Sequence, residues 1–202
     1  MAELTGPHRD RLIEATVAEF ASAGYDGASL NRIIRAAGLS KSSFYHAVGS
    51  KSDLLDAVVS SLVADVRSRW TPPAPAVFAG DEFWPQVDRV LSDLLALTVT
   101  DPALRLLGRI FYLPATGAAD ARSALVDSMR SWVGEVLRVG AASGAVRDDV
   151  PVDALAAAAF GMLRGLDEWA LRTATTSIST GKVGEAASAP GLLLRGMLTT
   201  PG

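Results

Sequence analysis

The chain of 202 residues is long enough for one large domain or two small ones, and a hydrophobic content of 49% can fill a sizeable core. It has no cysteine, which excludes disulfides, thiolate metal sites and cysteine nucleophiles, and its 2 histidines lie far apart in sequence, which argues against a metal site. A net charge of −3 gives no general attraction to nucleic acid. Because alanine and leucine dominate the apolar residues, we expect an all-α fold.

The N-terminal residues "MAELTGPHRDRL" lack the basic stretch and apolar run of an export signal. No uninterrupted apolar stretch reaches the roughly eighteen residues that a membrane-spanning helix needs. We therefore expect a soluble, cytoplasmic protein without metal or cofactor.

The first predicted helix starts near Pro7, which suits a first helical turn. Ile13, Val17 and Phe20 follow at spacings of four and three, and Gly24 ends the pattern. The segment therefore predicts a helix with one apolar face.

A short second helix is predicted to follow, with Ser29 as its N-cap. Its apolar side consists of Leu30, Ile33, Ile34 and Ala37. Gly38 is suited to the left-handed conformation that closes a helix.

Two further helices are predicted from capping signals. Ser40 as N-cap places Leu39 and Phe44 at the two positions of a hydrophobic staple, which fixes the angle at which the chain enters the third helix. Ser50 caps the fourth helix, with Asp53 at the position of a capping-box acid. The fourth helix is long and continues through "LLDAVVSSLVADVRSRW".

The proline-rich segment 71–80, "TPPAPAVFAG", ends the fourth helix and is predicted to be a loop. A second long loop is predicted at 173–189, "TATTSISTGKVGEAASA". We divide the chain into an N-terminal helical domain, residues 1–55, and a second helical domain, residues 56–202, with about nine helices in total. Further helices are predicted at about 81–99, 102–113, 119–142, 151–173 and 190–199.

The segment from Ser29 to Lys51 is locally basic, although the chain as a whole is acidic. It contains the cations Arg32, Arg35, Lys41 and Lys51 and no acid. A chance gap between acids on a solvated surface is the alternative. If the segment touches DNA, this local charge is what the phosphate backbone requires.

The second and third predicted helices, with the turn between them, have the dimensions of a helix-turn-helix, whose second helix enters the major groove. At about 100° per residue, Phe44 and Val48 face the other helices, while Ser42 and His46 point away. Ser43 and Tyr45 flank this outward side, which is small, polar and aromatic. A purely structural corner between two helices would match the turn equally well.

The stretch "RLIEATVAEFASAGYDGASLNRIIRAAGLSKSSFYHAVGSKSDLLDAVV" resembles the N-terminal domain of the TetR family of transcriptional regulators over about residues 9–59. The shared features are "F…GY" at the end of the first helix, a serine opening the second, and "AAGLSKSSFYHAVGSKSDLL" from the turn into the fourth. This resemblance implies a homodimer that binds a palindromic operator and releases it when a small molecule binds.

The family's DNA contacts carry over to positions at the starts of three helices and along the third. Tyr45 and Lys51 occupy positions that contact phosphates in the family, and Lys41, Ser42 and His46 are the better candidates for base readout. The residues at 42–43 and 47–48 differ from those that are frequent in the family, so the resemblance does not predict the operator sequence. The implied DNA-binding residues are Ser29, Asn31, Lys41, Ser42, Ser43, Tyr45, His46 and Lys51.

The segment "VDALAAAAFGMLRGLDEWAL" is apolar almost all round, with a stripe of small residues at Ala154, Ala158, Gly161 and Gly165. Such a helix is either central to its own domain or packs on a second subunit. We favour the second interpretation, in which residues 151–173 and 190–199 form the dimer interface.

An effector site is expected among the bulky residues of the second domain, although aromatic residues at helical spacing also fill ordinary cores. Arg109 either meets a ligand carboxylate or pairs internally with Asp101, Glu135 or Asp167, and we favour the pair. The candidate lining residues are Trp84, Leu91, Leu95, Arg109, Phe111, Tyr112, Met129, Trp132, Phe160 and Trp169.

Signals for catalysis are absent from the sequence. There is no nucleophile elbow or phosphate-binding loop, and neither histidine has a triad-type partner. We therefore expect a ligand-responsive, non-enzymatic transcriptional regulator, and a repressor rather than an activator. The alternative is a small-molecule-binding or protein-interaction protein whose helix-turn-helix has lost specific DNA binding.

Overall fold

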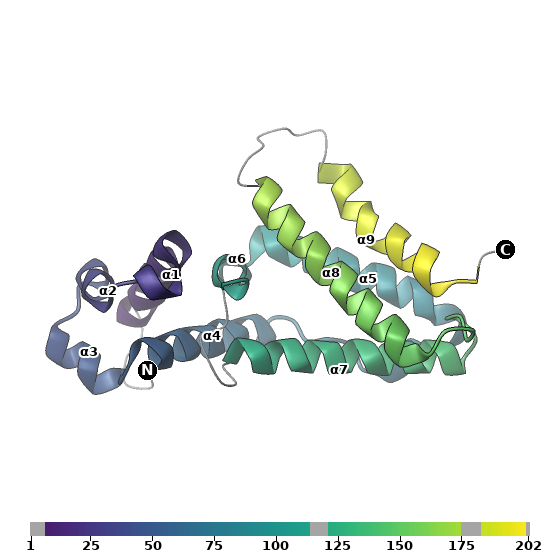
Figure 1. Ribbon diagram of the computed structural model, residues 1–202, viewed down its shortest axis with the longest axis horizontal. Coiled ribbons are helices and arrows are strands. Elements are labelled where there is room, and N and C mark those ends of the chain that lie inside the picture. Colours follow the sequence, from purple (N-terminus) through teal and green to yellow (C-terminus); the bar gives the residue numbers. More distant parts are fainter. Residues whose placement is uncertain (1–6, 114–120, 175–182, 201–202) are drawn as a thin grey trace. The chain divides into compact units, whose positions relative to one another are not determined.

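The computed structural model describes residues 7–113, 121–174 and 183–200, and its α-helices are labelled in Figure 1. Within these ranges the fold is all-α, with nine α-helices and no strand, as the sequence predicts. The α-helices are α1 (Pro7–Gly27), α2 (Leu30–Ala37), α3 (Lys41–Ala47), α4 (Lys51–Arg67), α5 (Phe83–Thr100), α6 (Pro102–Phe111), α7 (Ala121–Ala142), α8 (Val152–Ala174) and α9 (Val183–Leu198).

The chain forms two compact units that are interleaved in sequence. The first unit comprises residues 1–71 and 100–125, and the second comprises 72–99 and 126–202. The first therefore contains α1 to α4 and α6, and the second contains α8, α9 and most of α5 and α7. The proposed domain division at residues 55 and 56 stays a prediction.

The first unit is built around a single aliphatic and aromatic core. Leu12, Val17 and Phe20 of α1 are fully buried, as are Ile33 of α2 and Phe44 of α3. α6 packs against both α1 and α4, and contributes Ala103, Leu107 and Ile110 to the same core. The predicted apolar faces of the first three helices are thus buried together.

One carboxylate ties the start of α6 to the end of α4. Asp101 is the N-cap of α6 and accepts the Leu104 backbone N–H at 3.0 Å through Oδ1. Its carboxylate also accepts two hydrogen bonds from the Arg69 guanidinium, with Nη2 at 3.0 Å from Oδ1. Arg69 thereby holds the pKa of Asp101 below its usual value, although burial opposes this by favouring the neutral acid.

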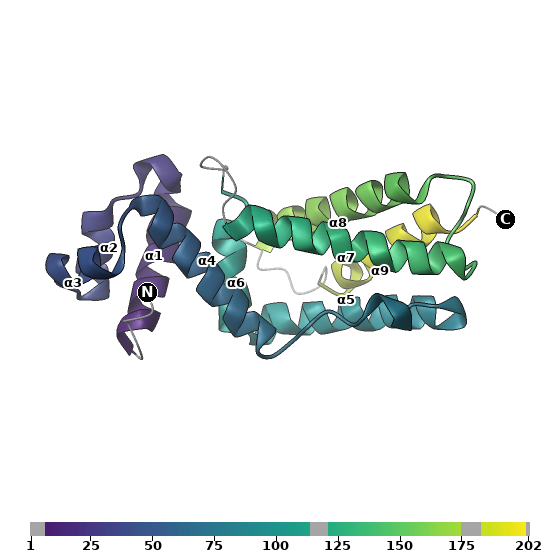
Figure 2. The same cartoon turned by 90° about the horizontal axis from the view of Figure 1, so that it is seen from below.

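The second unit has an aromatic core at one end. Phe78 and Phe83 are fully buried, and Phe78 packs edge-on against Trp132. A Cβ added at Gly140 of α7 would lie 2.5 Å from Cε2 of Phe83, so glycine is required where the two segments meet. Elsewhere in the unit α8 and α9 pack against each other (Figure 2).

The proline-rich segment is more ordered than a plain loop. It contains the 3₁₀ turn Pro75–Val77, and a second turn, Gly80–Glu82, leads into α5. Trp132 Nε1 donates to the Pro73 carbonyl at 2.8 Å, which fixes the segment to α7. α4 ends at Arg67, three residues before the predicted end at Trp70 and ahead of the prolines, and the buried Phe78 anchors the proline-rich segment in the core.

The last helix is the main correction to the predicted elements. α9 begins at Val183, whereas the sequence placed its start at residue 190, and Pro190 lies inside the helix. A start at residue 190 would place Pro190 in the first turn, where its missing N–H has no consequence. The alanine-rich stretch before it has sufficient helix propensity to extend the helix, even though Pro190 removes one backbone hydrogen bond.

The Asp101–Arg69 pair predicts how the free energy of unfolding depends on pH. Asp101→Asn keeps an N-cap side chain but removes the charge, so we expect a lower free energy of unfolding at neutral pH. Because the native pKa is lowered, the stabilisation is present above the unfolded pKa and is lost as the pH falls through the folded value. Urea unfolding of both proteins between pH 7 and pH 3 measures this. A difference that stays constant down to pH 3 would contradict it.

Candidate nucleic-acid interface

The turn between α2 and α3 is fixed by backbone hydrogen bonds around one glycine. Gly38 has φ 66° and ψ 32°, the left-handed conformation predicted for it. Its N–H donates to the Arg35 carbonyl at 3.2 Å, and the Leu39 N–H donates to the Ile34 carbonyl at 3.1 Å. This pair of bonds is a Schellman motif, which closes α2 and sets the direction of the next helix.

α3 begins on its predicted cap. The Ser40 side chain accepts the Ser43 backbone N–H at 3.0 Å, and the Ser40 and Ser43 hydroxyls lie 2.8 Å apart. Phe44 and Val48 are buried, with exposed fractions of 0% and 4%. The inward side of α3 is therefore anchored, and the Ser43 hydroxyl is partly engaged in the cap.

The outward side of α3 is exposed as predicted. Lys41, Ser42, Tyr45 and His46 all face solvent, and the Tyr45 ring remains 52% exposed although it packs edge-on against Phe44. An exposed aromatic beside a cation and a hydroxyl is suited to contact with a phosphate or a base.

α4 also begins on its predicted cap, Ser50, which accepts the Asp53 N–H at 3.1 Å. Lys51, in the first turn, is only half-exposed. Its ammonium donates to the carbonyls of Tyr25 at 2.8 Å and Asp26 at 3.1 Å and lies 5.1 Å from the centroid of the Tyr25 ring. Lys51 thus joins the start of α4 to the end of α1.

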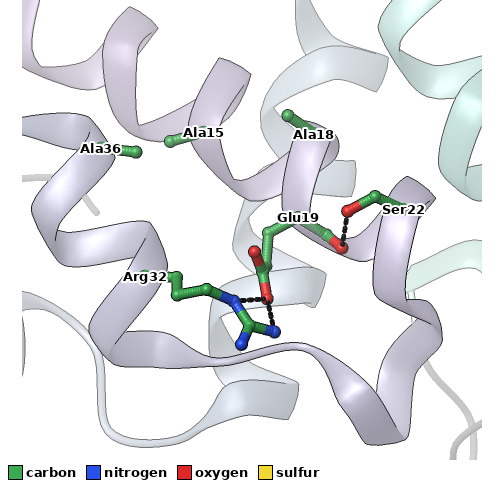
Figure 3. Close-up of a pocket in the computed structure, with 6 residues that line it drawn as sticks. All are labelled: Ala15, Ala18, Glu19, Ser22, Arg32 and Ala36. Carbon is green, nitrogen blue, oxygen red and sulfur yellow. Dashed lines mark hydrogen bonds and ion pairs between the residues drawn. The ribbon is translucent and has the colours of Figure 1, made fainter.

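The start of α2 differs from the other two. Ser29 occupies the N-cap position, but its side chain makes no capping hydrogen bond. The Ser29 N–H instead donates to Glu19 of α1 at 2.8 Å, and Glu19 also binds Arg32 (Figure 3). Asn31 is exposed beside them. Sequence reasoning missed Glu19 because it lies outside the basic segment.

The four cations of the basic segment therefore divide into two kinds. Arg32 and Lys51 bind protein groups. Arg35 and Lys41 are exposed and have no hydrogen-bond or ion-pair partner in the part of the chain that the structure describes. The charge available to an external anion is smaller than the sequence alone indicates.

The ten predicted effector residues fall in both units. Arg109, Phe111 and Tyr112 belong to the first, and the other seven belong to the second. Phe160 is buried, with Arg130 over its ring at 5.5 Å, and Trp132 is half-buried and packs edge-on against the core residue Phe78. Of the other eight, Leu95, Arg109, Met129 and Trp169 are exposed.

The favoured internal pair of Arg109 is not what the structure shows. Arg69 is the partner of Asp101, and Arg109 is exposed on α6 without an ion-pair partner among the described residues. Arg69 follows α4 directly, and the prediction considered only cations inside apolar helical runs.

A groove of about 470 Å³ lies between α4 and the first turn of α7 in the first unit. Its walls are mostly apolar, with the Arg67 guanidinium as its cation. It includes none of the predicted effector residues. The lining residues are Ser60, Val63, Ala64, Arg67, Ala121, Ala124 and Leu125.

Lys51 and Lys41 give a matched test of the two kinds of cation. Lys51→Met removes two charge-assisted hydrogen bonds, so we expect the free energy of unfolding to fall by about 1–2 kcal/mol. Lys41→Met removes an exposed, unpaired charge, and its effect should stay within about 0.5 kcal/mol. Urea denaturation followed by circular dichroism compares them, and equal losses would contradict the assignment.

Two further properties concern the described ranges of the chain. Every helix there falls short of the length and apolarity that a bilayer crossing needs. The same ranges contain no cluster of three or more His, Cys, Asp or Glu residues placed to hold a metal ion.

Comparison with solved structures finds transcriptional regulators that share this fold. A TetR-family regulator from Streptomyces coelicolor A3 is 28% identical, with 94% of this chain and 91% of that chain covered and a TM-score of 0.60. FadR from Bacillus subtilis, crystallised with stearoyl-CoA, is 14% identical, with coverage of 96% and 100% and a TM-score of 0.63. NalD, the secondary repressor of the MexAB-OprM multidrug efflux pump in Pseudomonas aeruginosa, is 16% identical, with coverage of 93% and 95% and a TM-score of 0.62.

No curated protein matches the sequence significantly. The family model described as "Bacterial regulatory proteins, tetR family" matches residues 12–58, the segment that holds α2, α3 and their turn. Members of this family are non-enzymatic, DNA-binding transcription factors. Residues 12–58 are therefore a helix-turn-helix domain of the TetR family of transcriptional regulators.

Proposed function

We propose that this regulator is a repressor that binds a palindromic operator as a homodimer and is released by a small-molecule effector. The observation that carries the proposal is the outward side of α3, where Lys41, Ser42, Tyr45 and His46 are exposed on a helix whose other side is anchored in the core. Such a helix presents a fixed set of side chains to a major groove.

The proposed contacts divide by chemistry. Lys41, Ser42 and His46 read base edges, because they project from the exposed side of α3. Tyr45 and Lys51 contact phosphates, and the Lys51 ammonium has one N–H beyond the two that donate to carbonyls.

At the start of α2, Ser29 and Asn31 complete the phosphate contacts. The Ser29 hydroxyl is not used as a cap, which supports this role. Ser43 contributes less than its position implies, because its hydroxyl lies 2.8 Å from that of Ser40.

The proposed dimer interface lies on α8 and α9. The small-residue stripe of α8 is exposed at Ala154, Ala158, Gly161 and Gly165. On α9, Leu192 and Leu193 are 67% and 49% exposed. A second pair of α8 and α9 helices would cover these apolar groups, and the glycines would allow the backbones to approach closely.

An effector is supported by the relatives, since FadR was crystallised with stearoyl-CoA and NalD is a repressor of an efflux pump. We propose that the effector binds residues of the 56–202 domain and stabilises a conformation in which the two α3 helices no longer match the spacing of the half-sites. Leu95, Met129 and Trp169 are exposed apolar side chains in that domain and are the proposed contacts. We also propose that the protein works in the cytoplasm.

Two substitutions that each remove one exposed hydroxyl test the DNA contacts. Tyr45→Phe should weaken binding to all sequences alike, because it removes a phosphate contact. Ser42→Ala should change the order of preference among operator variants by about 1 kcal/mol at one position, or about fivefold in affinity. Mobility shifts on DNA upstream of the protein's own coding region, repeated with single-base changes, measure both.

The same experiment tests the proposed function itself. If the unaltered protein forms no sequence-specific complex at low salt, the regulator proposal fails and the alternative without specific DNA binding is favoured. A reversal, in which Tyr45→Phe changes preference and Ser42→Ala acts uniformly, contradicts the division of roles.

Gly161→Leu tests the dimer. A Cβ added at Gly161 meets no atom of the described residues within 4 Å, so the change should leave the folded subunit intact. In the proposed dimer the leucine side chain holds the helices apart, and we expect the dimer dissociation constant to rise by more than about tenfold, or ~1.4 kcal/mol. Light scattering across a range of concentrations measures the mass. A dimer of unchanged affinity would place the interface elsewhere.

A further inference from the structure

We propose that Glu19 is a positioning residue for DNA binding, which fixes the start of α2 and keeps Arg32 away from the DNA backbone. The inference rests on the DNA binding proposed above. It adds a residue from α1, outside the turn and the two helices of the motif, to the determinants of affinity and specificity.

One carboxylate oxygen makes all of the contacts. Glu19 Oε1 accepts the Ser29 backbone N–H at 2.8 Å and Arg32 Nε at 2.8 Å, and Arg32 Nη2 makes a second contact with it (Figure 3). The Glu19 side chain is only 13% exposed, whereas that of Arg32 is 57% exposed. The hydrogen bonds from Arg32 and then from Ser29 lower the pKa of the Glu19 carboxyl, so it is ionised at neutral pH.

The arrangement replaces a capping box. In a capping box the third helical residue is a Glu or Gln that accepts the N–H of the N-cap residue. In α2 that third residue is Arg32, which has no acceptor, and the Ser29 side chain makes no cap either. Glu19 accepts the Ser29 N–H in its place, and its negative charge lies at the positive end of the α2 dipole.

The same carboxylate controls the direction of Arg32. Besides Glu19, the Arg32 guanidinium donates to the Gly27 carbonyl at 2.8 Å, so it is turned back toward the end of α1. The surrounding hollow, about 220 Å³, is lined otherwise by Ala15, Ala18, Ala36 and Ser22, whose small side chains do not obstruct the pair. The charge of Arg32 is therefore neutralised by an acid from α1, although the segment from Ser29 to Lys51 contains no acid of its own.

Keeping the Arg32 cation away from the DNA phosphates raises the specificity of binding. Each phosphate that a cation contacts adds affinity for any DNA sequence, and steepens the fall of log K with log salt by about 0.9. With Arg32 held by Glu19, the start of α2 contributes the Ser29 hydroxyl and Asn31 but not this arginine. Non-specific affinity is thereby limited while the operator contacts are kept in place.

Three variants of the full-length protein test the proposal. Glu19→Gln keeps an oxygen that accepts the Ser29 N–H but removes the charge that holds Arg32. We expect a several-fold gain in affinity for an unrelated DNA fragment and a salt slope steeper by about 0.9. In Glu19→Gln with Arg32→Gln, the slope should return to that of the unaltered protein, and Arg32→Gln alone should leave it unchanged.

Asp149→Asn is the matched control. It removes the carboxylate partner of Arg147, bound through Nε and Nη2 at 2.6 Å, in the other compact unit. We expect no change in the salt slope, because this arginine lies outside the helix-turn-helix domain. A steeper slope here would show that releasing any arginine suffices, and would overturn the proposal.

Glu19→Leu separates positioning from charge, since it removes the acceptor for the Ser29 N–H as well. We expect it to lose operator affinity about tenfold, and Glu19→Gln to retain most of it, with thermal unfolding followed for both. If Glu19→Leu does not fold, the salt slopes of the other variants still decide.

Two further outcomes overturn the inference while leaving DNA binding intact. One is a Glu19→Gln protein with the affinity and salt slope of the unaltered chain. The other is a steeper slope that persists when Arg32 is also replaced, since the released cation would then be another residue. If the unaltered protein binds no operator, the proposed function fails instead, so the two failures are distinguishable.

Discussion

The left-handed conformation of Gly38 is the constraint on which the DNA-binding unit depends. With φ at 66°, the chain closes α2 and returns at once to the Ser40 cap of α3. A residue with a side chain is strained in this conformation by about 1–2 kcal/mol. Because only one residue separates Gly38 from the next cap, the turn has no slack, and the direction of α3 follows from it.

Burial of Phe44 and Val48 converts that direction into a fixed orientation of the exposed side chains. Both lie in the core that also contains Phe20 and Ile33. A rotation of α3 about its axis would expose Phe44, which is 0% exposed at present. The hydrophobic contacts on one side therefore hold Ser42 and His46 on the other, and the same packing that stabilises the unit sets what it presents.

The local features of this unit could be predicted from sequence because each depends on residues close together in the chain. The Ser40 and Ser50 caps, the Gly38 turn and the apolar side of α3 are all read from spacings of a few residues. Pro190 shows where such rules fail. Its place inside α9 depends on the helix propensity of the preceding stretch, whereas a local rule assigned proline to a first turn.

The electrostatic part of the site could not be predicted in the same way, because its partners are distant in sequence. Glu19 and Arg32 are joined across two helices, Lys51 binds the Tyr25 carbonyl, and Arg69 binds Asp101. A count of charges between residues 29 and 51 gives four cations and no acid, but only the fold shows which of them have partners.

The effector residues were hard to predict for a related reason. Aromatic residues at helical spacing are used equally by cores and by ligand sites, and sequence does not separate them. Trp132 illustrates this, since its Nε1 donates to Pro73 and its ring packs on Phe78. A side chain that is fixed in this way serves the fold, which makes the exposed Met129 and Trp169 better candidates than the buried aromatics.

The side chains that stabilise this unit are largely different from those proposed to contact DNA, although Lys51 belongs to both groups. The cations with protein partners hold helix ends together, while Arg35 and Lys41 contribute charge to the surface. Long-range attraction to DNA depends on the local net charge, whereas specificity depends on contacts at defined positions. A protein of net charge −3 therefore needs only a few unpaired cations, provided that they surround a rigid recognition helix. The capped, glycine-closed turn supplies that rigidity.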